Sequence, residues 1–286
     1  MSTKEEALKK AREQKAGIDR PGDSLQQAVE EAVRKALDGT LPLDREKLSP
    51  RSFTVRTNTG RGNAVSGKAF PPGEAEPPLW RSKEIDSIAI NIKRQIGEGK
   101  KGAVLFASSV SGEGTTTVCS NVSLALTKIC TGNILLLDGN ARHPEIHALF
   151  NLDPFPGLTD VLMGKIHWED AVRNSDLKNF YILPFGQPLQ EPLSLLGSEG
   201  MEGLLNTLKT EFDFILLDVP PILESAEAEM IAPWVEASVL IIQARATRKE
   251  VVMQAVERFI RHRAFLGAIF NQKKRIIPRF RYQRLK

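Results

Sequence analysis

Residues 102–117, GAVLFASSVSGEGTTT, carry the strongest information about the fold. The stretch begins with an apolar run at residues 103–107, turns at Gly112 and Gly114, and continues into residues 115–129, where apolar side chains recur at helical spacing. A run that is apolar on both faces, followed by a glycine turn and a helix, is typical of one strand–loop–helix unit of a parallel sheet. The stretch therefore predicts an α/β domain.

Five further apolar runs follow along the chain, each bounded by turn residues. They are NILLLDGN from residue 133, NFYILPFG from 179, FDFILLDV from 212, SVLIIQA from 238 and LGAIFNQ from 266. Helix-like stretches such as KEVVMQAVERFIRHRA separate them. Strands of this kind, linked by helices, belong to a mostly parallel sheet that is covered on both faces. We therefore predict a doubly wound α/β domain over residues 80–272.

The turn after the first strand has the composition of a phosphate-binding loop. Gly112 and Gly114 let several backbone N–H groups converge on an anion, and the N-terminus of the next helix adds positive potential. Thr116 stands where a hydroxyl normally reaches Mg²⁺, but Thr115 replaces the lysine expected before it. Taken alone, the loop could also be an ordinary glycine turn into a helix.

Two aspartates strengthen the interpretation as a nucleotide site. Asp138 ends the second apolar run and Asp218 ends a later one, and the carboxyl ends of parallel strands meet at one edge of a sheet. An aspartate at such a position is the usual water-mediated ligand of Mg²⁺ in a nucleotide site. Either residue could instead cap a turn, but together with the loop they predict a site for a nucleotide and Mg²⁺.

Composition divides the chain into four regions. Residues 1–48 form a predicted helical or disordered extension, residues 49–79 a Pro- and Gly-rich linker, residues 80–272 the α/β domain, and residues 273–286 a basic tail. Within the extension, Ser24 begins a short amphipathic helix. That helix could dock on its own domain or on a partner.

The formal charge of +4 is unevenly distributed. The tail, residues 273–286, holds seven of the 39 basic residues and none of the 35 acidic ones, so residues 1–272 are net −3. Such a tail could be a solvated end, a contact with an anionic membrane or a docking site for an acidic partner.

Several classes of protein are disfavoured. No apolar run reaches the roughly 18 to 20 residues of a membrane-spanning helix, and the charged N-terminal residues do not resemble a signal peptide. Cys119 and Cys130 lie too far apart on one predicted helix to form a disulfide, which fits a reducing cytoplasm. The tryptophans show no stacking pattern with basic residues, so we expect no nucleic-acid partner.

Over residues 80–272 the chain resembles the capsular polysaccharide tyrosine autokinases, which are bacterial protein-tyrosine kinases of capsule and exopolysaccharide synthesis within the deviant-Walker P-loop ATPases. The resemblance rests on several blocks in family order: SSVSGEGTTT (Walker A), LLLDGNARHPEIHALF (A′), PGLTDVLMG, EFDFILLDVPP (Walker B) and LGAIFNQ. It implies a P-loop fold that binds ATP and Mg²⁺.

The resemblance also implies roles for individual residues. Asp138 would orient Mg²⁺ or accept the tyrosine proton with Arg142 beside it, and Asp218 would hold the metal through water. Asn271 would contact the base. The phosphates would be surrounded by the segment Gly112, Glu113, Gly114, Thr115, Thr116 and Thr117, with Thr116 on the metal. His143 and His147, at i, i+4 spacing, are expected to cap or pack rather than bind a metal.

Several positions depart from the family pattern. Thr115 replaces the lysine that holds the β and γ phosphates, Val110 replaces a second signature lysine, and Asn140 replaces the second aspartate of the A′ block. The ring-assembly segment Glu-x-x-Arg-x-x-Arg aligns with residues 84–90, which lack both arginines, and the tail carries only Tyr282 in place of a tyrosine cluster. These losses suggest weakened or abandoned autokinase activity.

Three functions follow from the resemblance and its departures. The first is an ATP-binding member of the autokinase family, acting in exopolysaccharide or capsule synthesis or in chain-length control, with weakened catalysis. The second is a non-catalytic pseudokinase regulator or scaffold of the export machinery, and the third a positioning or partitioning ATPase. The expected partners are a membrane polysaccharide copolymerase at the cytoplasmic face, an anionic membrane surface and a second copy of the chain. The expected location is cytoplasmic, at the inner face of the plasma membrane.

Overall fold

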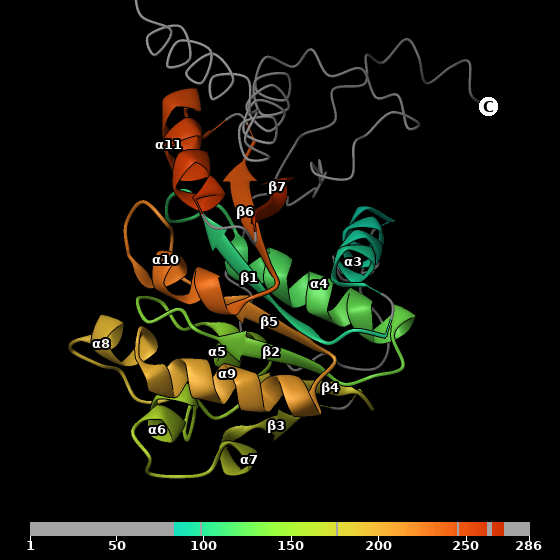
Figure 1. Cartoon of the computed structure of the whole chain (residues 1–286), viewed down its shortest axis with the longest axis vertical. Helices are drawn as coiled ribbons and strands as arrows, with labels where there is room; N and C mark the ends of the chain where they lie inside the picture. The colour runs from blue at the N-terminus through green and yellow to red at the C-terminus, as the bar shows by residue number, and fades with distance from the viewer. Residues whose placement is uncertain (1–82, 98, 176, 245, 262–264, 272–286) are drawn as a thin grey trace, which may run out of the picture. The chain divides into compact units, whose positions relative to one another are not determined.

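A computed structural model describes residues 83–97, 99–175, 177–244, 246–261 and 265–271 (Figure 1). The predicted extension (1–48), linker (49–79) and basic tail (273–286) lie outside the described residues. The prediction of an α/β domain is confirmed over the described part, which begins at α3 and ends at β7.

Seven strands form one sheet in the order β3-β4-β2-β5-β1-β6-β7. Their bounds are β1 Gly102–Ser108, β2 Ile134–Asp138, β3 Arg173–Asn174, β4 Phe180–Leu183, β5 Phe214–Asp218, β6 Ala237–Gln243 and β7 Phe265–Asn271. All neighbouring pairs are parallel except β3 with β4. The six predicted strands are confirmed, whereas β3 was not predicted, because two residues are too short to show a period.

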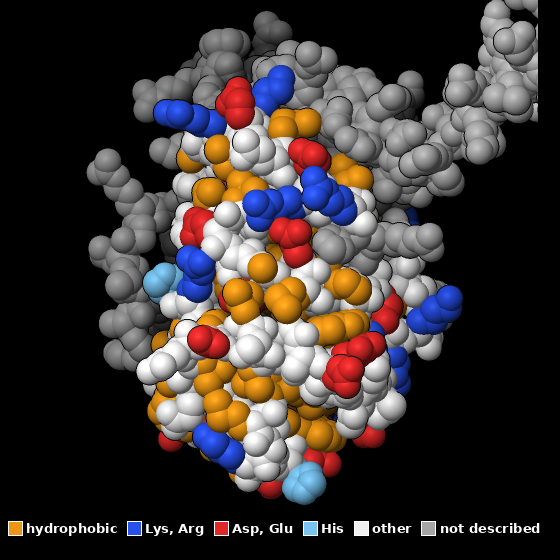
Figure 2. Space-filling view, turned by 60° about the vertical axis from the view of Figure 1, so that its left-hand side comes forward, with side chains coloured by type: hydrophobic (Ala, Val, Ile, Leu, Met, Phe, Trp, Pro, Cys, Tyr) orange, Lys and Arg blue, Asp and Glu red, His pale blue; other side chains and the backbone are white. Residues whose placement is uncertain are grey.

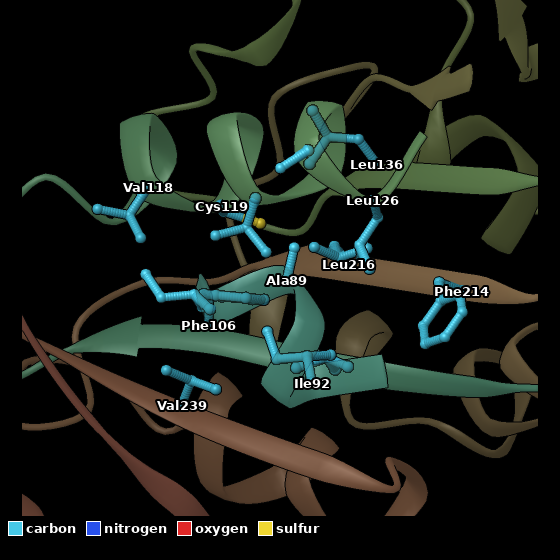
Figure 3. Close-up of a cluster of buried hydrophobic side chains, with 14 of the residues drawn as sticks. Ala89, Ile92, Phe106, Val118, Cys119, Leu126, Leu136, Phe214, Leu216 and Val239 are labelled. Atoms are coloured by element: carbon cyan, nitrogen blue, oxygen red, sulfur yellow. The ribbon is translucent and has the colours of Figure 1, made fainter. Parts of the chain in front are cut away.

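Helices α3 (Lys83–Ile96) and α4 (Thr115–Ile129) pack together and cover one face of the sheet. The core beneath them takes alternate residues of each central strand, such as Val104 and Phe106 of β1. Figure 3 shows Phe106, Leu136 and Leu216 of three strands meeting Val118 and Cys119 of α4. Complete burial of a side chain of this size contributes about 1.5–3 kcal/mol, so this layer holds α4, and with it the preceding loop, firmly on the sheet.

The intervening strand residues, such as Leu105, are also buried but belong to the opposite face. There α9 (Glu199–Glu211) and α10 (Glu227–Ile231) contact β1, and α11 (Lys249–Ile260) contacts β6. Shorter elements connect the layers: α5 Ile146–Leu149, α6 Leu158–Leu162, α7 Trp168–Ala171, α8 Pro192–Leu196 and the 3₁₀ helix η2 Ala232–Trp234. Helices therefore cover both faces, as a doubly wound fold requires.

The face shown in Figure 2 carries hydrophobic side chains over its lower half, whereas basic and acidic side chains are interspersed over its upper half. Large hydrophobic side chains that are exposed come from several elements, among them Met163, Leu193 and Met230. Within the described ranges, no helix has the length and apolar character needed to cross a bilayer.

Candidate functional site

The segment between β1 and α4 wraps tightly because two of its glycines adopt left-handed backbone conformations. Gly112 has φ 84° and Gly114 has φ 87°. A Cβ at Gly114 would lie 2.4 Å from Nδ2 of Asn271, whereas a Cβ at Gly112 would meet nothing within 4 Å. Gly114 is therefore required by both conformation and space, and Gly112 by conformation alone.

The side chain of Glu113 turns into the protein. Its carboxylate is buried and accepts hydrogen bonds from the backbone N–H groups of Ser109 (2.6 Å), Val110 (3.0 Å) and Gln243 (2.9 Å), and from the hydroxyl of Thr247. These bonds tie the loop to the segment that follows β6. The side chain of Glu113 therefore points away from the predicted phosphate site, and only its backbone could contact a phosphate.

The loop borders a hollow of about 210 Å³ at the carboxyl ends of the strands. The residues lining it are Ser108, Ser111, Gly112, Gly114, Thr115, Thr116, Thr117, Asn140, His143, Glu145, Val219 and Pro221. The structure thus brings together most of the predicted phosphate contacts. No lysine or arginine is among these lining residues, so none of them replaces the cation missing at Thr115.

Asp218 lies fully buried beside the first turn of α4. Its Oδ2 accepts a hydrogen bond from Oγ1 of Thr116 at 2.6 Å, while its Oδ1 is buried without a hydrogen-bond partner. Burial raises the pKa of Asp218 well above its usual range, and the neighbouring Asp138 raises it further. A divalent cation would relieve both the unpaired oxygen and the desolvated charge, so Thr116 and Asp218 fit the predicted Mg²⁺ site.

Asp138 pairs with Asp218 in the register of β2 and β5. Its two carboxylate oxygens accept hydrogen bonds from the backbone N–H groups of Asn140 (3.1 Å) and Ile146 (3.1 Å). Burial raises its pKa to about 7, although these hydrogen bonds oppose the shift. A carboxylate that titrates near neutral pH can accept a proton in catalysis, the role predicted for Asp138.

Other predicted site residues form contacts that the sequence did not indicate. The guanidinium of Arg142 donates to the backbone carbonyl of Glu224, so Arg142 contacts the segment after β5. The side chain of Asn271 donates to the carbonyl of Glu113 at 2.8 Å and covers Gly114. Asn271 therefore braces the loop, and a contact with a base stays a prediction.

Three residues of this region were not assigned to the site. His143 was expected to cap or pack, yet it is exposed and lines the hollow together with Glu145. Glu224 accepts hydrogen bonds from the backbone N–H and the hydroxyl of Ser111, both at 2.7 Å. His143 and Glu145 follow Asp138 closely in the sequence, so their position at the hollow could have been predicted. No sequence pattern predicts the contact between Glu224 and Ser111.

A second metal site was sought around His143 and His147. Across the described residues, no group of three or more His, Cys, Asp or Glu side chains is arranged to hold a metal ion.

A glycine loop between the first buried strand and a helix, with two strand-terminal aspartates beside it, defines the class of P-loop nucleoside-triphosphatase folds. No family model matches the chain. The tyrosine-protein kinase YwqD of Bacillus subtilis is 32% identical over 200 residues, which span 70% of this chain and 84% of that protein. The putative tyrosine-protein kinase CapB of Staphylococcus aureus is 28% identical over 199 residues, 69% of this chain and 86% of that protein.

Solved structures of bacterial tyrosine kinase domains are also similar to this chain. The VpsO kinase domain is 29% identical with a TM-score of 0.60, covering 66% of this chain and 95% of that domain. The kinase domain of the Escherichia coli tyrosine kinase ETK shares the fold, with a TM-score of 0.67 at 18% identity over 79% of this chain and 93% of that domain. The chain belongs to the family of bacterial tyrosine-protein kinases. The family predicted from the sequence blocks is thereby confirmed.

Proposed function

We propose that this chain binds ATP with Mg²⁺ and acts in capsule or exopolysaccharide synthesis, or in control of chain length, with weakened protein-tyrosine kinase activity. One observation carries the proposal: the hollow keeps its glycine loop and the hydroxyl of Thr116, and Asp218, bonded to Thr116, has an unpaired buried carboxylate oxygen, yet no lysine or arginine lines the hollow. The septum site-determining protein MinD of Pyrococcus horikoshii, complexed with Mg-ADP, supports nucleotide binding by analogy, at 27% identity and a TM-score of 0.50 over 64% of this chain and 76% of that one.

Different residues would contact the phosphates and the metal. Backbone N–H groups from Gly112 onward, at the N-terminus of α4, would bind phosphate oxygens. Thr116 and Asp218 would hold Mg²⁺, which would supply positive charge to offset that of the phosphates. Asp138 would accept the proton of a tyrosine hydroxyl, since its pKa of about 7 lets it act near neutral pH.

The missing lysine accounts for the weakened catalysis. In a P-loop the lysine stabilises charge that develops on the transferred phosphoryl group, and loss of one such donor raises the barrier by about 3–4 kcal/mol. Thr115 is buried and has no charge to offer. Arg142, which follows Asp138 in the sequence, donates to Glu224 and does not line the hollow.

A pseudokinase regulator is the second candidate, and the same lack of a lysine or arginine in the hollow favours it. In that role the chain would bind nucleotide, or a partner alone, without phosphoryl transfer. The positioning or partitioning ATPase is less well supported, because Val110 stands in place of the signature lysine. Under either of the first two candidates we propose a polysaccharide copolymerase at the cytoplasmic face of the membrane as partner, and a contact of the basic tail with anionic lipid.

Restoring the lysine tests the proposal. Calorimetry should detect binding of Mg-ADP to the full chain at millimolar concentration, and Thr115→Lys should tighten it about tenfold, the contribution of one charge-assisted hydrogen bond. Thr131→Lys adds the same charge at an exposed turn outside the hollow and should leave affinity unchanged. Absence of binding by both the wild type and Thr115→Lys would rule out the nucleotide site.

Phosphotyrosine formation from labelled ATP separates the two candidates. A weak kinase gives a signal that Thr115→Lys increases and Asp138→Ala abolishes. A regulator gives no signal in the wild type, even where Mg-ADP binds.

A further inference from the structure

Three consecutive backbone N–H groups at the start of the phosphate loop donate to carboxylates of the chain itself. Those of Ser109 and Val110 bind Glu113, a residue of the same loop. That of Ser111 binds Oε1 of Glu224, and its hydroxyl binds Oε2, each at 2.7 Å. Backbone N–H groups of such loops form anion sites. Glu224, which lies in the segment between β5 and α10, therefore accepts a hydrogen bond from an N–H group adjacent to those that would bind phosphate.

Glu224 carries its negative charge at the rim of the hollow. The hydroxyl of Ser111 holds the pKa of this carboxyl below its usual range; the backbone N–H of Ser111, Arg142 and His143 act in the same direction. Ser111 and His143 both line the hollow. The charge of Glu224 therefore lies one hydrogen bond away from the wall against which a polyphosphate would bind.

Arg142 compensates this charge locally. Its guanidinium donates to the backbone carbonyl of Glu224, and its charge favours the ionised carboxylate. Removing the charge of Glu224 would leave Arg142 as an uncompensated cation beside a hollow that no lysine or arginine lines. Counted together with Glu145, which also lines the hollow, the charge at this rim would then change from −1 to 0.

We propose that Glu224 is a specificity-determining residue that makes this site favour a nucleoside diphosphate over a triphosphate. The inference rests on the proposed nucleotide binding. Repulsion by a fixed carboxylate grows with the charge of the ligand, and Mg-ATP carries one more negative charge than Mg-ADP. Glu224 acts through Ser111 and through its charge, so it positions and selects without catalysing.

The test compares affinities of the full chain for Mg-ADP and Mg-ATP by calorimetry. Glu224→Gln keeps an acceptor for Ser111 but loses the charge, and should shift the ATP-to-ADP affinity ratio about threefold toward ATP at low salt, the effect of one charge at roughly 10 Å in a wet site. The shift should shrink as salt is raised, because this rim is open to solvent. The control is Glu229→Gln. Glu229 lies on α10 and pairs with Arg258 of α11, so its loss should leave the ratio unchanged.

A second variant distinguishes charge from structure. Glu224→Ala removes both the charge and the hydrogen bonds to Ser111; selection by charge predicts the same shift in the ratio as for Glu224→Gln. A shift in the alanine variant alone would overturn the proposal and assign Glu224 a structural role. Binding with an unchanged ratio in both variants would also overturn it while leaving nucleotide binding intact. If neither the wild type nor either variant binds Mg-ADP, both the inference and the proposed function fail.

Discussion

The phosphate loop lines the hollow, and the carboxylate edge, formed by Asp138 and Asp218, lies buried next to that loop; the two differ in how many of their polar groups the protein itself pairs. The loop is held by the chain itself: Glu113 anchors it from within, Glu224 bonds to Ser111, and Asn271 braces it from β7. The edge is not satisfied, since Asp218 keeps an unpaired buried oxygen and burial raises the pKa of both aspartates. The first three N–H groups of the loop, at residues 109–111, are thus paired without a ligand, whereas the edge holds charge that only a cation or a proton can relieve.

A substitution at Gly114 should break the loop. Gly114→Ala combines a left-handed backbone with a Cβ 2.4 Å from Asn271, and should lower the free energy of unfolding by about 3 kcal/mol, since strain and overpacking each cost about 1–3 kcal/mol. Gly112→Ala, which meets no neighbour, should cost only about 1 kcal/mol. Equal losses in urea unfolding would mean that Asn271 does not brace the loop.

The pH dependence of stability should reveal the strain at the edge. The pKa of Asp138 is raised in the folded protein, so its protonated form stabilises the fold, and this stabilisation is lost as pH rises from about 4 through 7. Without metal, the free energy of unfolding should fall by about 2–3 kcal/mol between pH 5 and 8 through Asp138 alone, because a tenfold change in proton concentration is worth about 1.4 kcal/mol for each proton that only the folded state binds. Asp138→Asn should flatten that slope.

The matched control is Asp170→Asn, at an exposed position on α7, which should keep the wild-type slope. The two slopes are compared rather than the absolute stabilities, because an amide cannot accept both backbone hydrogen bonds of Asp138. A slope in Asp138→Asn as steep as that of the wild type would place the titration elsewhere.

Asp218 should show opposite effects on stability and on ligand binding. Asp218→Asn keeps an acceptor for Thr116 and removes a buried charge, so the metal-free protein should become more stable at pH 8. The same change should weaken Mg-ADP binding about tenfold, because a ligand of the metal shell is lost. Thermal unfolding without metal and calorimetry with it measure the two effects, and a parallel loss of both would contradict a metal role.

Much of the fold could be predicted because its signals are local. Six strands carry uninterrupted apolar runs, and Asp138 and Asp218 lie at the ends of two of them, so the parallel sheet places both at one edge. The short strand β3 escaped prediction because it has too few residues for a period. The extension, the linker and the tail lie outside the described residues, so those regions and the contact proposed for the tail stay predictions.

The contacts around the loop could not be predicted in the same way. Glu113 was expected in the segment that surrounds the phosphates, and the four donors from two segments that bind its buried carboxylate were not foreseen. Arg142 was expected beside Asp138, which stays a prediction, and its bond to the carbonyl of Glu224 was not foreseen. These contacts join groups that lie far apart in the sequence. Residue spacing along the chain therefore does not predict them.

The opening stretch, residues 102–117, was sufficient to establish a strand, a glycine loop and a helix, and Thr115 in it already showed the absence of the lysine. Tertiary packing determined which residues lie around Thr115: the hollow is lined by Thr115, His143 and Glu145, and Glu224 is bonded to its rim. Backbone preferences and apolar periodicity act over a few residues and can be read directly. Electrostatic surroundings are the sum of groups brought together from separate strands and their loops, so they exist only in the folded molecule.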